Sequence, residues 1–496
     1  MECWGIFGER QSLFFSMGKD FGMAEERRVS QRDMALQQQY LDRLRARNEQ
    51  AEKRTGRRPL ALVQTYGCQQ NENDSQRLCG MLARAGYGFC TSPQEADVIL
   101  FNTCAVRENA ELRVLGNLGA LKHEKRRRPE LIIGICGCMM QQPHIAQEVQ
   151  KKYSHVDLIF GTHTLYQFPQ LLSEASETHG RAVSLLDIDG QIAEDIPVRR
   201  EGGVKAYVSV MYGCNNFCSY CIVPYVRGRE RSRKPEDILR ELGEVAQEGY
   251  REVMLLGQNV NSYGKDLDEG VDFAALLAQA QKVEGIERIR FMTSHPKDFH
   301  DRLIEVMAGS DKICTQLHLP VQAGSDKVLS DMNRGYTRAE YLEKIKKVRA
   351  ALPDIAITTD IIVGFPSETQ EDFEKTLSLL EEVRYDSVYS FIYSKRSGTR
   401  AAEMEHVLTD AQIHRNFDRL LEVQNRISKE INDAYLGGVY QILVEGKSKN
   451  NDKMLTGRTS SGKIVNFAGD ERCIGRLIEV KITDAKTWSL SGEVVS

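Results

Sequence analysis

The sequence predicts an α/β protein with an N-terminal parallel-sheet α/β domain, a central partial (β/α)6 barrel and a small C-terminal antiparallel β-barrel. Short apolar runs alternate with amphipathic helical stretches over residues 59–178, and a strand-then-helix alternation occurs six times over residues 203–432. Short β-rich runs separated by glycine turns fill residues 433–496. We take these ranges as the predicted domains, since 496 residues are enough for about three domains of ordinary size.

Residues 1–58 are predicted to be a charged N-terminal extension. Between Ala24 and Arg58 the sequence holds 10 Lys/Arg and 6 Asp/Glu but few apolar residues. This composition is typical of a charged, solvated helix, with disorder as the alternative.

Three cysteines stand at matching places in the first domain. Cys68, Cys104 and Cys138 each lie just past the carboxyl end of a predicted strand. Because loops from neighbouring parallel strands meet at one edge of a sheet, we expect these thiols to converge in one crevice. Cys136 is an alternative third ligand, but a residue inside a buried strand reaches a loop-built site less easily, which favours Cys138. The strands expected here are residues 60–66, 98–102, 131–135 and 158–160.

The central region is predicted to be an incomplete parallel barrel. In such folds the functional groups lie in loops at the carboxyl ends of the strands. Cys214, Cys218 and Cys221 follow the first of these strands directly. The expected strands are residues 206–211, 252–256, 289–292, 316–319, 357–363 and 388–393, and the helices between them include residues 235–248, 341–351 and 371–383.

The spacing Cys-x3-Cys-x2-Cys indicates an iron–sulfur site. It supplies three thiolates, with no fourth cysteine or histidine close by. A structural zinc site uses four ligands, which makes a zinc knuckle the weaker interpretation. A four-iron cluster held by three thiolates keeps one iron open for a ligand that is not protein.

The C-terminal region is expected to form a small barrel that could bind RNA by its fold. Its charge does not indicate RNA, since there are 9 Lys/Arg against 8 Asp/Glu from Asp433 onward. The expected strands are residues 441–445, 454–458, 464–467, 477–482 and 489–494.

Composition and charge exclude several classes of protein. The net charge of −4 excludes a polycation, so any nucleic-acid contact must come from local basic patches. No apolar run approaches the roughly 18 residues of a membrane span, and the first residues, M-E-C-W-G-I-F-G-E-R, do not resemble a signal peptide. We therefore expect a cytoplasmic protein whose 12 cysteines are metal ligands or free thiols before they are disulfides.

The two cysteine trios, the order of the domains and several local segments resemble the methylthiotransferase family of radical S-adenosylmethionine (SAM) enzymes. The resemblance covers residue 59 to the end. It rests on segments such as T-Y-G-C-Q-Q-N-E-N-D-S, C-G-C-M-M-Q-Q, Y-G-C-N-N-F-C-S-Y-C-I and D-I-I-V-G-F-P-S-E-T. The segments N-T-C-A-V-R and R-G-R-E-R-S-R are most similar to the branch of tRNA-2-methylthio-N6-dimethylallyladenosine synthases. In this family the three domains are a methylthiotransferase N-terminal domain, a radical SAM core and a TRAM domain.

The resemblance implies methylthiolation of carbon 2 of N6-isopentenyladenosine next to the anticodon in tRNA. The product would be 2-methylthio-N6-dimethylallyladenosine. A purine C2–H is not acidic enough for general-base chemistry at neutral pH, so a radical supplied by a cofactor is a sensible route. Two related activities would share both trios: methylthiolation of threonylcarbamoyl-adenosine in tRNA, or of a ribosomal protein aspartate. A non-catalytic iron–sulfur or zinc scaffold is the alternative from another class.

The implied cofactors are SAM and two [4Fe-4S] clusters, one on each cysteine trio. The resemblance places Tyr220 against the SAM adenine, and Gln258 and Asn259 near its amino group. Asp360 is expected near the SAM ribose and adenine. Ordinary loop chemistry is the alternative interpretation for Gln258, Asn259 and Asp360.

The implied partners are a tRNA anticodon stem-loop, a sulfur source and an electron donor, either a reductase or a flavodoxin/ferredoxin. No membrane is expected. Arginines that follow the second trio are predicted to contact RNA phosphates, with a solvated surface as the alternative. These arginines are Arg227, Arg229, Arg231 and Arg233.

Overall fold

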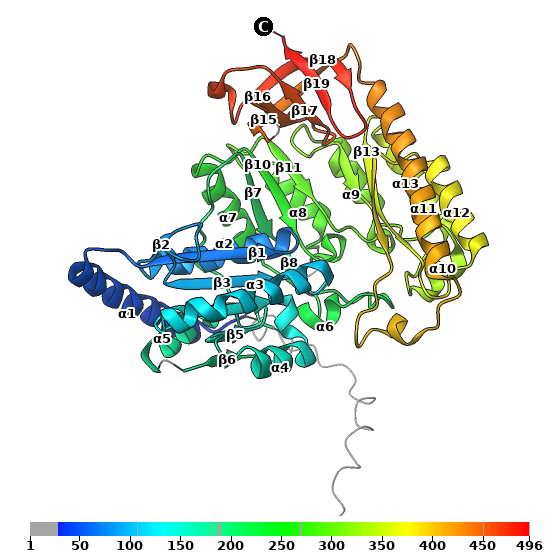
Figure 1. Cartoon of the computed structure of the whole chain (residues 1–496). Coiled ribbons are helices and arrows are strands. Elements are labelled where there is room, and N and C mark those ends of the chain that lie inside the picture. The colour runs from blue at the N-terminus through cyan, green and yellow to red at the C-terminus, as the bar shows by residue number, and fades with distance from the viewer. Residues whose placement is uncertain are drawn as a thin grey trace, which may run out of the picture.

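A computed structural model of the chain shows three folded parts stacked along one direction (Figure 1). The N-terminal domain and the C-terminal barrel lie at opposite ends of a central α/β core. The predicted fold class is confirmed. The first 27 residues of the predicted extension lie outside the described residues. The structure describes residues 28–106, 108–178, 180–185, 190–267, 270–449 and 451–495.

The N-terminal domain is a six-stranded parallel sheet in the order β2-β1-β3-β4-β5-β6. Because β2 and β3 lie on opposite sides of β1, the strand order reverses between β1 and β3. Such a switch point opens a crevice at the carboxyl ends of the strands. The strands are β1 (Leu60–Tyr66), β2 (Gly88–Phe89), β3 (Val98–Thr103), β4 (Ile132–Gly137), β5 (Leu158–Phe160) and β6 (Ala182–Ser184).

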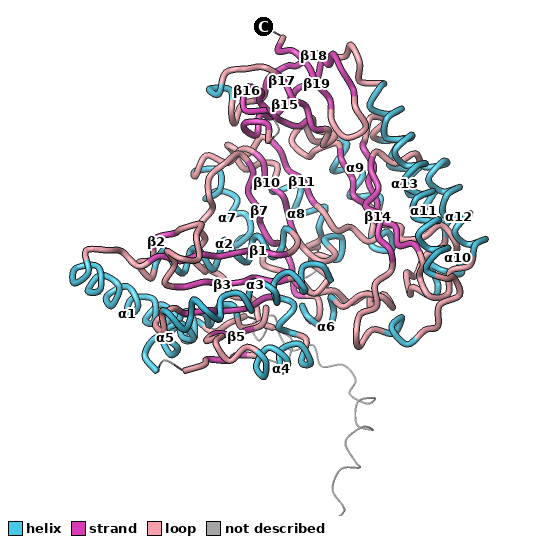
Figure 2. The backbone as a smooth tube through the Cα atoms, in the orientation of Figure 1, coloured by secondary structure: helices cyan, strands magenta, loops and turns pink. Residues whose placement is uncertain are grey.

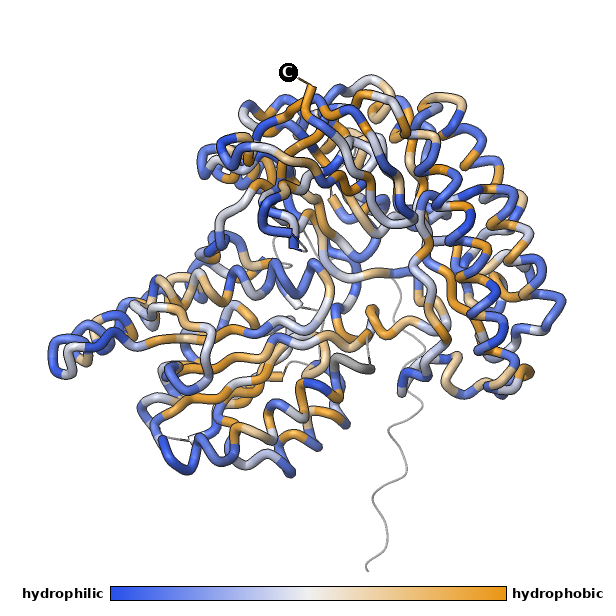
Figure 3. Tube along the Cα trace, turned by 45° about the horizontal axis from the view of Figure 1, so that its top comes forward, coloured by the Kyte–Doolittle hydropathy of each residue, from blue (hydrophilic) through white to orange (hydrophobic). Residues whose placement is uncertain are grey.

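Helices cover both faces of this sheet. Alternate strand residues face each way, so Leu100 packs with helices α1, α2 and α5 whereas Phe101 packs with α3 and α4. Figure 3 shows the strands mainly hydrophobic between these layers. The helices are α1 (Gln31–Thr55), α2 (Gln69–Arg84), α3 (Glu108–Arg127), α4 (Pro143–Lys152) and α5 (Phe168–Thr178), with the 3-10 turns η1 (Cys138–Gln141) and η2 (Leu165–Gln167).

Helix α1 confirms the helix predicted in the N-terminal extension, but its environment differs from the prediction. Leu41 and Leu44 are buried against the rest of the domain, and Asn48 donates to the carbonyl oxygen of Ala85 at 2.9 Å. The helix is therefore solvated on one face only. Its sparse apolar residues, spaced three apart, were too few to stand out among the charges.

The central core consists of six parallel strands in two three-stranded sheets, β7-β10-β11 and β12-β13-β14. A parallel bridge between Ile289 and Ile313 joins the two sheets, which completes the predicted partial barrel. The strands are β7 (Lys205–Ser209), β10 (Glu252–Leu256), β11 (Arg288–Phe291), β12 (Gln316–His318), β13 (Ala356–Val363) and β14 (Ser387–Ile392).

The helices of this core cover the outer face of the strands, and α11, α12 and α13 form one flank (Figure 2). The helices are α6 (Val223–Arg227), α7 (Pro235–Gln247), α8 (Phe273–Ala280), α9 (Asp301–Ala308), α10 (Asp326–Asp331), α11 (Arg338–Ala351), α12 (Gln370–Val383) and α13 (Asp410–Asp433), with the turns η3 (Val260–Ser262), η4 (Pro296–Asp298) and η5 (Arg400–Glu403).

The C-terminal region is a closed barrel in the order β15-β16-β17-β19-β18. The pair β17–β19 is parallel and the other pairs are antiparallel. Arg288, near the amino end of β11, donates to the carbonyl oxygens of Arg458 and Gln441, so the barrel docks at the amino ends of the core strands. The elements are β15 (Val439–Ser448), β16 (Asn451–Arg458), β17 (Ile464–Phe467), η6 (Glu471–Cys473), β18 (Leu477–Ala485) and β19 (Leu490–Val494).

Among the described residues, none of the helices combines the length and the apolar character that a membrane span needs.

Candidate functional site: two cysteine trios at a domain boundary

The first cysteine trio comprises Cys68, Cys104 and Cys138, which follow the neighbouring strands β1, β3 and β4. The structure brings them together as predicted: the side chains of Cys68 and Cys104 are close enough for each to shift the pKa of the other, Cys138 also raises the pKa of Cys104, and Cys68 raises that of Cys138. Cys104 and Cys138 are buried, whereas Cys68 is exposed. The trio therefore opens towards the surface at Cys68.

Glycines permit the tight turns before two of these cysteines. Gly137, directly before Cys138, has φ +96°, and a Cβ there would lie 2.4 Å from Oδ1 of Asn102 and 2.5 Å from the carbonyl oxygen of Thr103. Gly67, directly before Cys68, would place a Cβ 2.6 Å from Oδ1 of Asn71. Only glycine fits the turn at residue 137, which delivers Cys138 to the end of β4.

Electrostatics favour a thiolate at the mouth of this trio. The hydrogen bond from Cys104 lowers the pKa of Cys68 to about 5, and the positive charge of Arg227 adds to this effect. The same bond, together with burial, raises the pKa of Cys104. The thiolate is the form of cysteine that binds metal, so a thiolate at Cys68 favours binding of the first metal ion at this trio.

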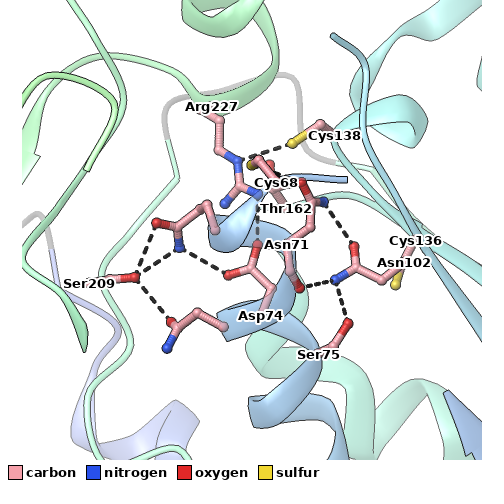
Figure 4. A network of polar contacts seen from close by, with 12 residues as sticks. Cys68, Asn71, Asp74, Ser75, Asn102, Cys136, Cys138, Thr162, Ser209 and Arg227 are labelled. Carbon is pink, nitrogen blue, oxygen red and sulfur yellow. Dashed lines mark hydrogen bonds and ion pairs between the residues drawn. The ribbon is translucent and has the colours of Figure 1, made fainter. Parts of the chain in front are cut away.

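Cys136 lies in β4 and does not join the trio. Its side chain is 1% exposed and packs in the core beneath the sheet, and burial raises its pKa well above the usual value. Figure 4 shows its sulfur turned away from those of Cys68 and Cys138. The geometry thus favours Cys138 over Cys136 as the third ligand.

The second cysteine trio comprises Cys214, Cys218 and Cys221, in the loop between β8 (Met211–Tyr212) and β9 (Arg231–Ser232). These short strands pair in antiparallel fashion and close the loop at its base. Gly213 has φ +77°, and a Cβ there would lie 2.0 Å from the carbonyl oxygen of Arg229. The loop is thus built with its two ends in contact, and glycine is required at its entrance.

Within this loop, backbone hydrogen bonds fix the cysteines. The amide of Cys214 donates to the carbonyl oxygen of Gly228 at 3.1 Å, and that of Cys221 donates to Cys218 at 2.9 Å. Burial raises the pKa of Cys214 to about 12 and raises that of Cys221 as well. These thiols stay protonated unless a cation or a metal compensates their charge.

One buried arginine lies against the second trio. Arg334 donates to Sγ of Cys218 at 3.4 Å, to the hydroxyl of Tyr220 at 3.4 Å and to the carbonyl oxygen of Pro320 at 2.6 Å. It is 4% exposed and forms no salt bridge with a carboxylate among the described residues. Buried charges in proteins are paired, so an uncompensated cation here fits an anionic group on the three cysteines.

The predicted SAM contacts lie around this loop and inside the partial barrel. Oε1 of Gln258 accepts from the amide of Gly213 at 2.5 Å, and Nδ2 of Asn259 donates to Asp298 at 2.7 Å. Oδ1 of Asn259 is buried without a hydrogen-bond partner among the described residues. The carboxylate of Asp360 lies 3.5 Å from Nε2 of His318 and remains 28% exposed. Gln258 therefore supports the cysteine loop, while Asn259 and Asp360 retain groups that a ligand could meet.

Three of the four predicted RNA-contacting arginines are buried, which is a correction. Arg227 pairs with Asp74 at 2.7 Å and Arg233 with Glu194 and Glu241 at 2.7 and 2.6 Å. Arg231 is buried and donates to the carbonyl oxygens of Arg229 and Arg227. Guanidiniums held in this way do not reach phosphates. Arg229 is exposed, with its guanidinium carbon 4.4 Å from the ring centroid of Phe217.

Arg227 instead reaches from the loop of the second trio to the first trio, where Figure 4 shows it beside Cys138 and Asp74. It ends helix α6, six residues after Cys221, and its Nε donates to Sγ of Cys138 at 3.1 Å. Helix α6 also packs on the first trio through Ile222 and Val226, which form a buried cluster with Ala105 and Cys138. The loop of the second trio thus touches a cysteine of the first.

Two exposed aromatic residues on β14 were missed by sequence reasoning. Tyr389 and Phe391 are 47% and 44% exposed, and they are in register with Asp360 and Ile362 on β13. The ring of Tyr389 meets that of His318 edge-on at 5.6 Å, so this row faces the interior of the partial barrel. The alternation of aromatic residues along residues 389–393 is the signal that could have identified them.

Within the described part of the chain, no three Cys, His, Asp or Glu side chains are arranged to bind a single metal ion. Each thiolate of an iron–sulfur cluster binds a different iron, so the trios fit a cluster better than one ion. Three thiols are the ligand set of a four-iron cluster that keeps one iron open, and a buried arginine beside each trio would compensate the negative charge of such a cluster.

Comparisons with known proteins match all three parts of the chain. A family model described as the Radical SAM superfamily matches residues 208–380, the uncharacterized protein family UPF0004 matches residues 61–161, and the TRAM domain matches residues 433–495. The radical SAM match contains the second trio, and the UPF0004 match contains the first.

Curated relatives match nearly the whole chain. The tRNA-2-methylthio-N(6)-dimethylallyladenosine synthase of Acetivibrio thermocellus is 55% identical over 94% of this chain and 97% of its own length. The protein of the same name from Clostridioides difficile is 53% identical over 93% of this chain and 96% of its own. A solved structure of the radical SAM methyltransferase TsrM from Kitasatospora setae covers 77% of this chain and 78% of its own, with 13% identity and a TM-score of 0.51, which shows a shared fold.

Proposed function

Because the chain belongs to the family of tRNA-2-methylthio-N(6)-dimethylallyladenosine synthases, we propose that it methylthiolates carbon 2 of N6-isopentenyladenosine next to the anticodon in tRNA. The product is 2-methylthio-N6-dimethylallyladenosine. The match covers almost the full length of the relative, so the proposal carries over the activity of the whole relative and not of one of its domains.

The observation that carries this proposal is the contact between the loop of the second trio and Cys138 of the first trio. The chemistry needs a radical source and a sulfur source close to one substrate carbon. Helix α6 joins the loop of the second trio directly to Cys138 of the first. A radical enzyme with one trio, or a scaffold with two independent metal sites, would not need this contact.

We propose that each trio holds a [4Fe-4S] cluster, on Cys68, Cys104 and Cys138 and on Cys214, Cys218 and Cys221. Three thiolates leave one iron of each cluster open. When bound, the cluster of the second trio and SAM supply a carbon radical, and the cluster of the first trio supplies sulfur. Tyr220, Asn259 and Asp360 are the proposed SAM contacts, and Gln258 is the residue that orients the cysteine loop.

The inner face of the partial barrel is the proposed site for the reacting nucleoside. Tyr389 and Phe391 present large apolar surfaces there, beside the polar side chains of Asp360 and His318. Unstacked RNA bases bind proteins by stacking on aromatic side chains, and an isopentenyl group adds apolar surface. These two rings therefore suit a prenylated adenine.

Arg229 is the proposed phosphate contact at the mouth of this site. It is exposed on the loop of the second trio, and phosphate contacts position RNA without reading its sequence. The domain ranges 59–178, 203–432 and 433–496 remain our proposed boundaries. A sulfur source and an electron donor, either a reductase or a flavodoxin/ferredoxin, are further proposed partners.

The experiment that tests this function is mass spectrometry of tRNA nucleosides from cells that lack the gene. Loss of 2-methylthio-N6-dimethylallyladenosine, with accumulation of N6-isopentenyladenosine, supports the proposal. Loss of methylthiolated threonylcarbamoyl-adenosine instead would assign the chain to the other tRNA activity. Complementation with the intact gene is the control.

A further inference from the structure

Each cysteine trio has one buried arginine that donates a hydrogen bond to one of its sulfurs. Arg227 donates to Sγ of Cys138 at 3.1 Å, and Arg334 donates to Sγ of Cys218 at 3.4 Å. Arg227 is 5% exposed and Arg334 is 4% exposed. The two arginines come from different parts of the central core, so this correspondence is not a consequence of one local motif.

The two guanidiniums differ in how far their charge is already compensated. Nη2 of Arg227 pairs with Oδ2 of Asp74 at 2.7 Å, and Nε2 of Gln70 donates to the other oxygen of that carboxylate at 3.3 Å. Arg334 contacts Pro320, Tyr336 and Tyr220, and among the described residues it has no carboxylate partner. The charge beside the second trio is therefore the less neutralised of the two.

Hydrogen bonds to the sulfurs and nearby charge set the reduction potential of an iron–sulfur cluster. Reduction adds one negative charge to the cluster. A donor and a positive charge at a ligand sulfur stabilise that reduced state more than the oxidised one, and so they raise the potential. In a buried site water screens this effect only weakly.

We infer that Arg227 and Arg334 are positioning residues that each raise the reduction potential of the cluster on its own trio, Arg227 on the first and Arg334 on the second. The inference rests on the proposed function, because it needs a cluster on each trio. Neither arginine touches the substrate in this assignment. Each acts through a cysteine, and Asp74 moderates the effect of Arg227.

The test separates the two clusters before measuring them. The full-length protein with Cys214, Cys218 and Cys221 all changed to Ala keeps the first trio, and the protein with Cys68, Cys104 and Cys138 changed to Ala keeps the second. Arg227→Met and Arg334→Met are introduced into both backgrounds, and the proteins are reconstituted with iron and sulfide. The midpoint potential is then measured by redox titration followed by electron paramagnetic resonance.

The expected result is a crossed pattern. Arg227→Met lowers the midpoint of the first cluster and leaves the second unchanged, and Arg334→Met does the reverse. The shift is larger for Arg334→Met, because no carboxylate compensates Arg334. The conservative changes Arg227→Lys and Arg334→Lys keep the charge and recover part of each shift. Unchanged midpoints, or equal shifts of both clusters by either variant, would overturn the inference.

A variant that is expected to raise the midpoint potential shows that the shifts do not result from loss of folding. Asp74→Asn removes the charge that compensates Arg227 and should raise the midpoint of the first cluster. A misfolded site does not raise a potential in this specific way, so a lowered or unchanged midpoint counts against the inference. Iron analysis of both backgrounds tests the two-cluster proposal separately. A trio that binds no iron contradicts the proposed function. It does not contradict the role of the arginine beside the other trio.

Discussion

The side chains of Gln70 and Ser209 hydrogen-bond to each other across the boundary between the N-terminal domain and the central core. Nε2 of Gln70 donates to Oγ of Ser209 at 2.9 Å, and Ser209 in turn lies within hydrogen-bonding distance of Oε1 of Gln70 and Oδ1 of Asn73. Gln70 is two residues after Cys68, and Ser209 is five residues before Cys214. Figure 4 shows Ser209 on the side of Asp74 away from Cys136 and Cys138. The boundary is therefore held by residues that lie close in sequence to the first cysteine of each trio.

We expect Ser209→Ala to loosen this boundary. The change leaves buried groups of Gln70 and Asn73 without a partner, which costs on the order of 1–3 kcal/mol. Protease cleavage in the linker at residues 190–204 should become faster. In calorimetry, the first unfolding transition should occur at a lower temperature. Ser75→Ala is the matched control, because Ser75 bonds to Thr65 and Asn102 within one domain. Linker cleavage as slow as in the wild type would contradict the boundary role.

Cys218→Ala should abolish SAM cleavage while the protein remains soluble. Two thiolates hold a four-iron cluster poorly, so the open iron is lost. The readout is 5′-deoxyadenosine formed by the anaerobically reconstituted protein with a chemical reductant. Cys314→Ala is the control, since Cys314 is a buried cysteine outside both trios. Normal 5′-deoxyadenosine formation by Cys218→Ala would refute the radical role of the second trio.

Cys104→Ala should keep SAM cleavage but lose methylthiolation of the RNA. The first trio lies in a separate domain and serves sulfur delivery in the proposed function. Cys136→Ala is the matched control and should be mild, because its sulfur packs beneath the sheet away from the trio. A null phenotype for Cys136→Ala, with activity retained by Cys138→Ala, would mean that the third ligand is misassigned.

Arg229→Gln should weaken binding of an anticodon stem-loop and reduce its salt dependence. The loss of one phosphate contact lowers the slope of log affinity against log salt by about one unit. SAM cleavage without RNA should not change. Arg126→Gln, at an exposed position of α3, is the control. Equal affinities for Arg229→Gln and the wild type at two salt concentrations would leave Arg229 as solvated surface and move the RNA contact elsewhere.

Glu368 gives a prediction about pH. Burial raises the pKa of this carboxyl to about 7, and its Oε1 has no hydrogen-bond partner among the described residues. The folded state therefore binds a proton more tightly than the unfolded state, so stability falls as pH rises from the unfolded pKa of about 4.3 through 7. In Glu368→Gln the melting temperature should no longer fall for this reason between pH 5 and about 8. In the control Glu371→Gln, at an exposed position, it should fall as in the wild type. A wild-type melting temperature that does not depend on pH would contradict the burial effect.

The sequence predicted most strands and both cysteine trios, because these depend on local patterns. Strand β10 lies at residues 252–256 as expected, and Cys68, Cys104 and Cys138 follow strand ends that an apolar run identifies on its own. The parallel pairing of β17 with β19 was not predicted. This pairing depends on how the barrel closes, and the sequence of one strand does not specify which strand pairs with it.

The arginine run shows where sequence reasoning stops. Basic residues after the second trio suggested an RNA-contacting surface, but two of the carboxylates that neutralise them lie far away in the chain: Asp74 precedes Arg227 by 153 residues, and Glu194 precedes Arg233 by 39. Whether a charge is buried depends on such partners, which only the tertiary fold brings together. The same reason explains why the contact between Arg227 and Cys138 was not foreseen.

The central claim is that both trios act on one prenylated adenosine. The most direct measurement is mass spectrometry of nucleosides from an anticodon stem-loop that carries N6-isopentenyladenosine, after anaerobic incubation with the reconstituted protein, SAM, a reductant and sulfide. We predict 2-methylthio-N6-dimethylallyladenosine from the wild type, and unchanged N6-isopentenyladenosine from both Cys104→Ala and Cys218→Ala. Formation of the methylthio nucleoside by either variant at the wild-type rate, or its absence from the wild-type reaction while a threonylcarbamoyl-adenosine stem-loop is methylthiolated, would contradict the claim.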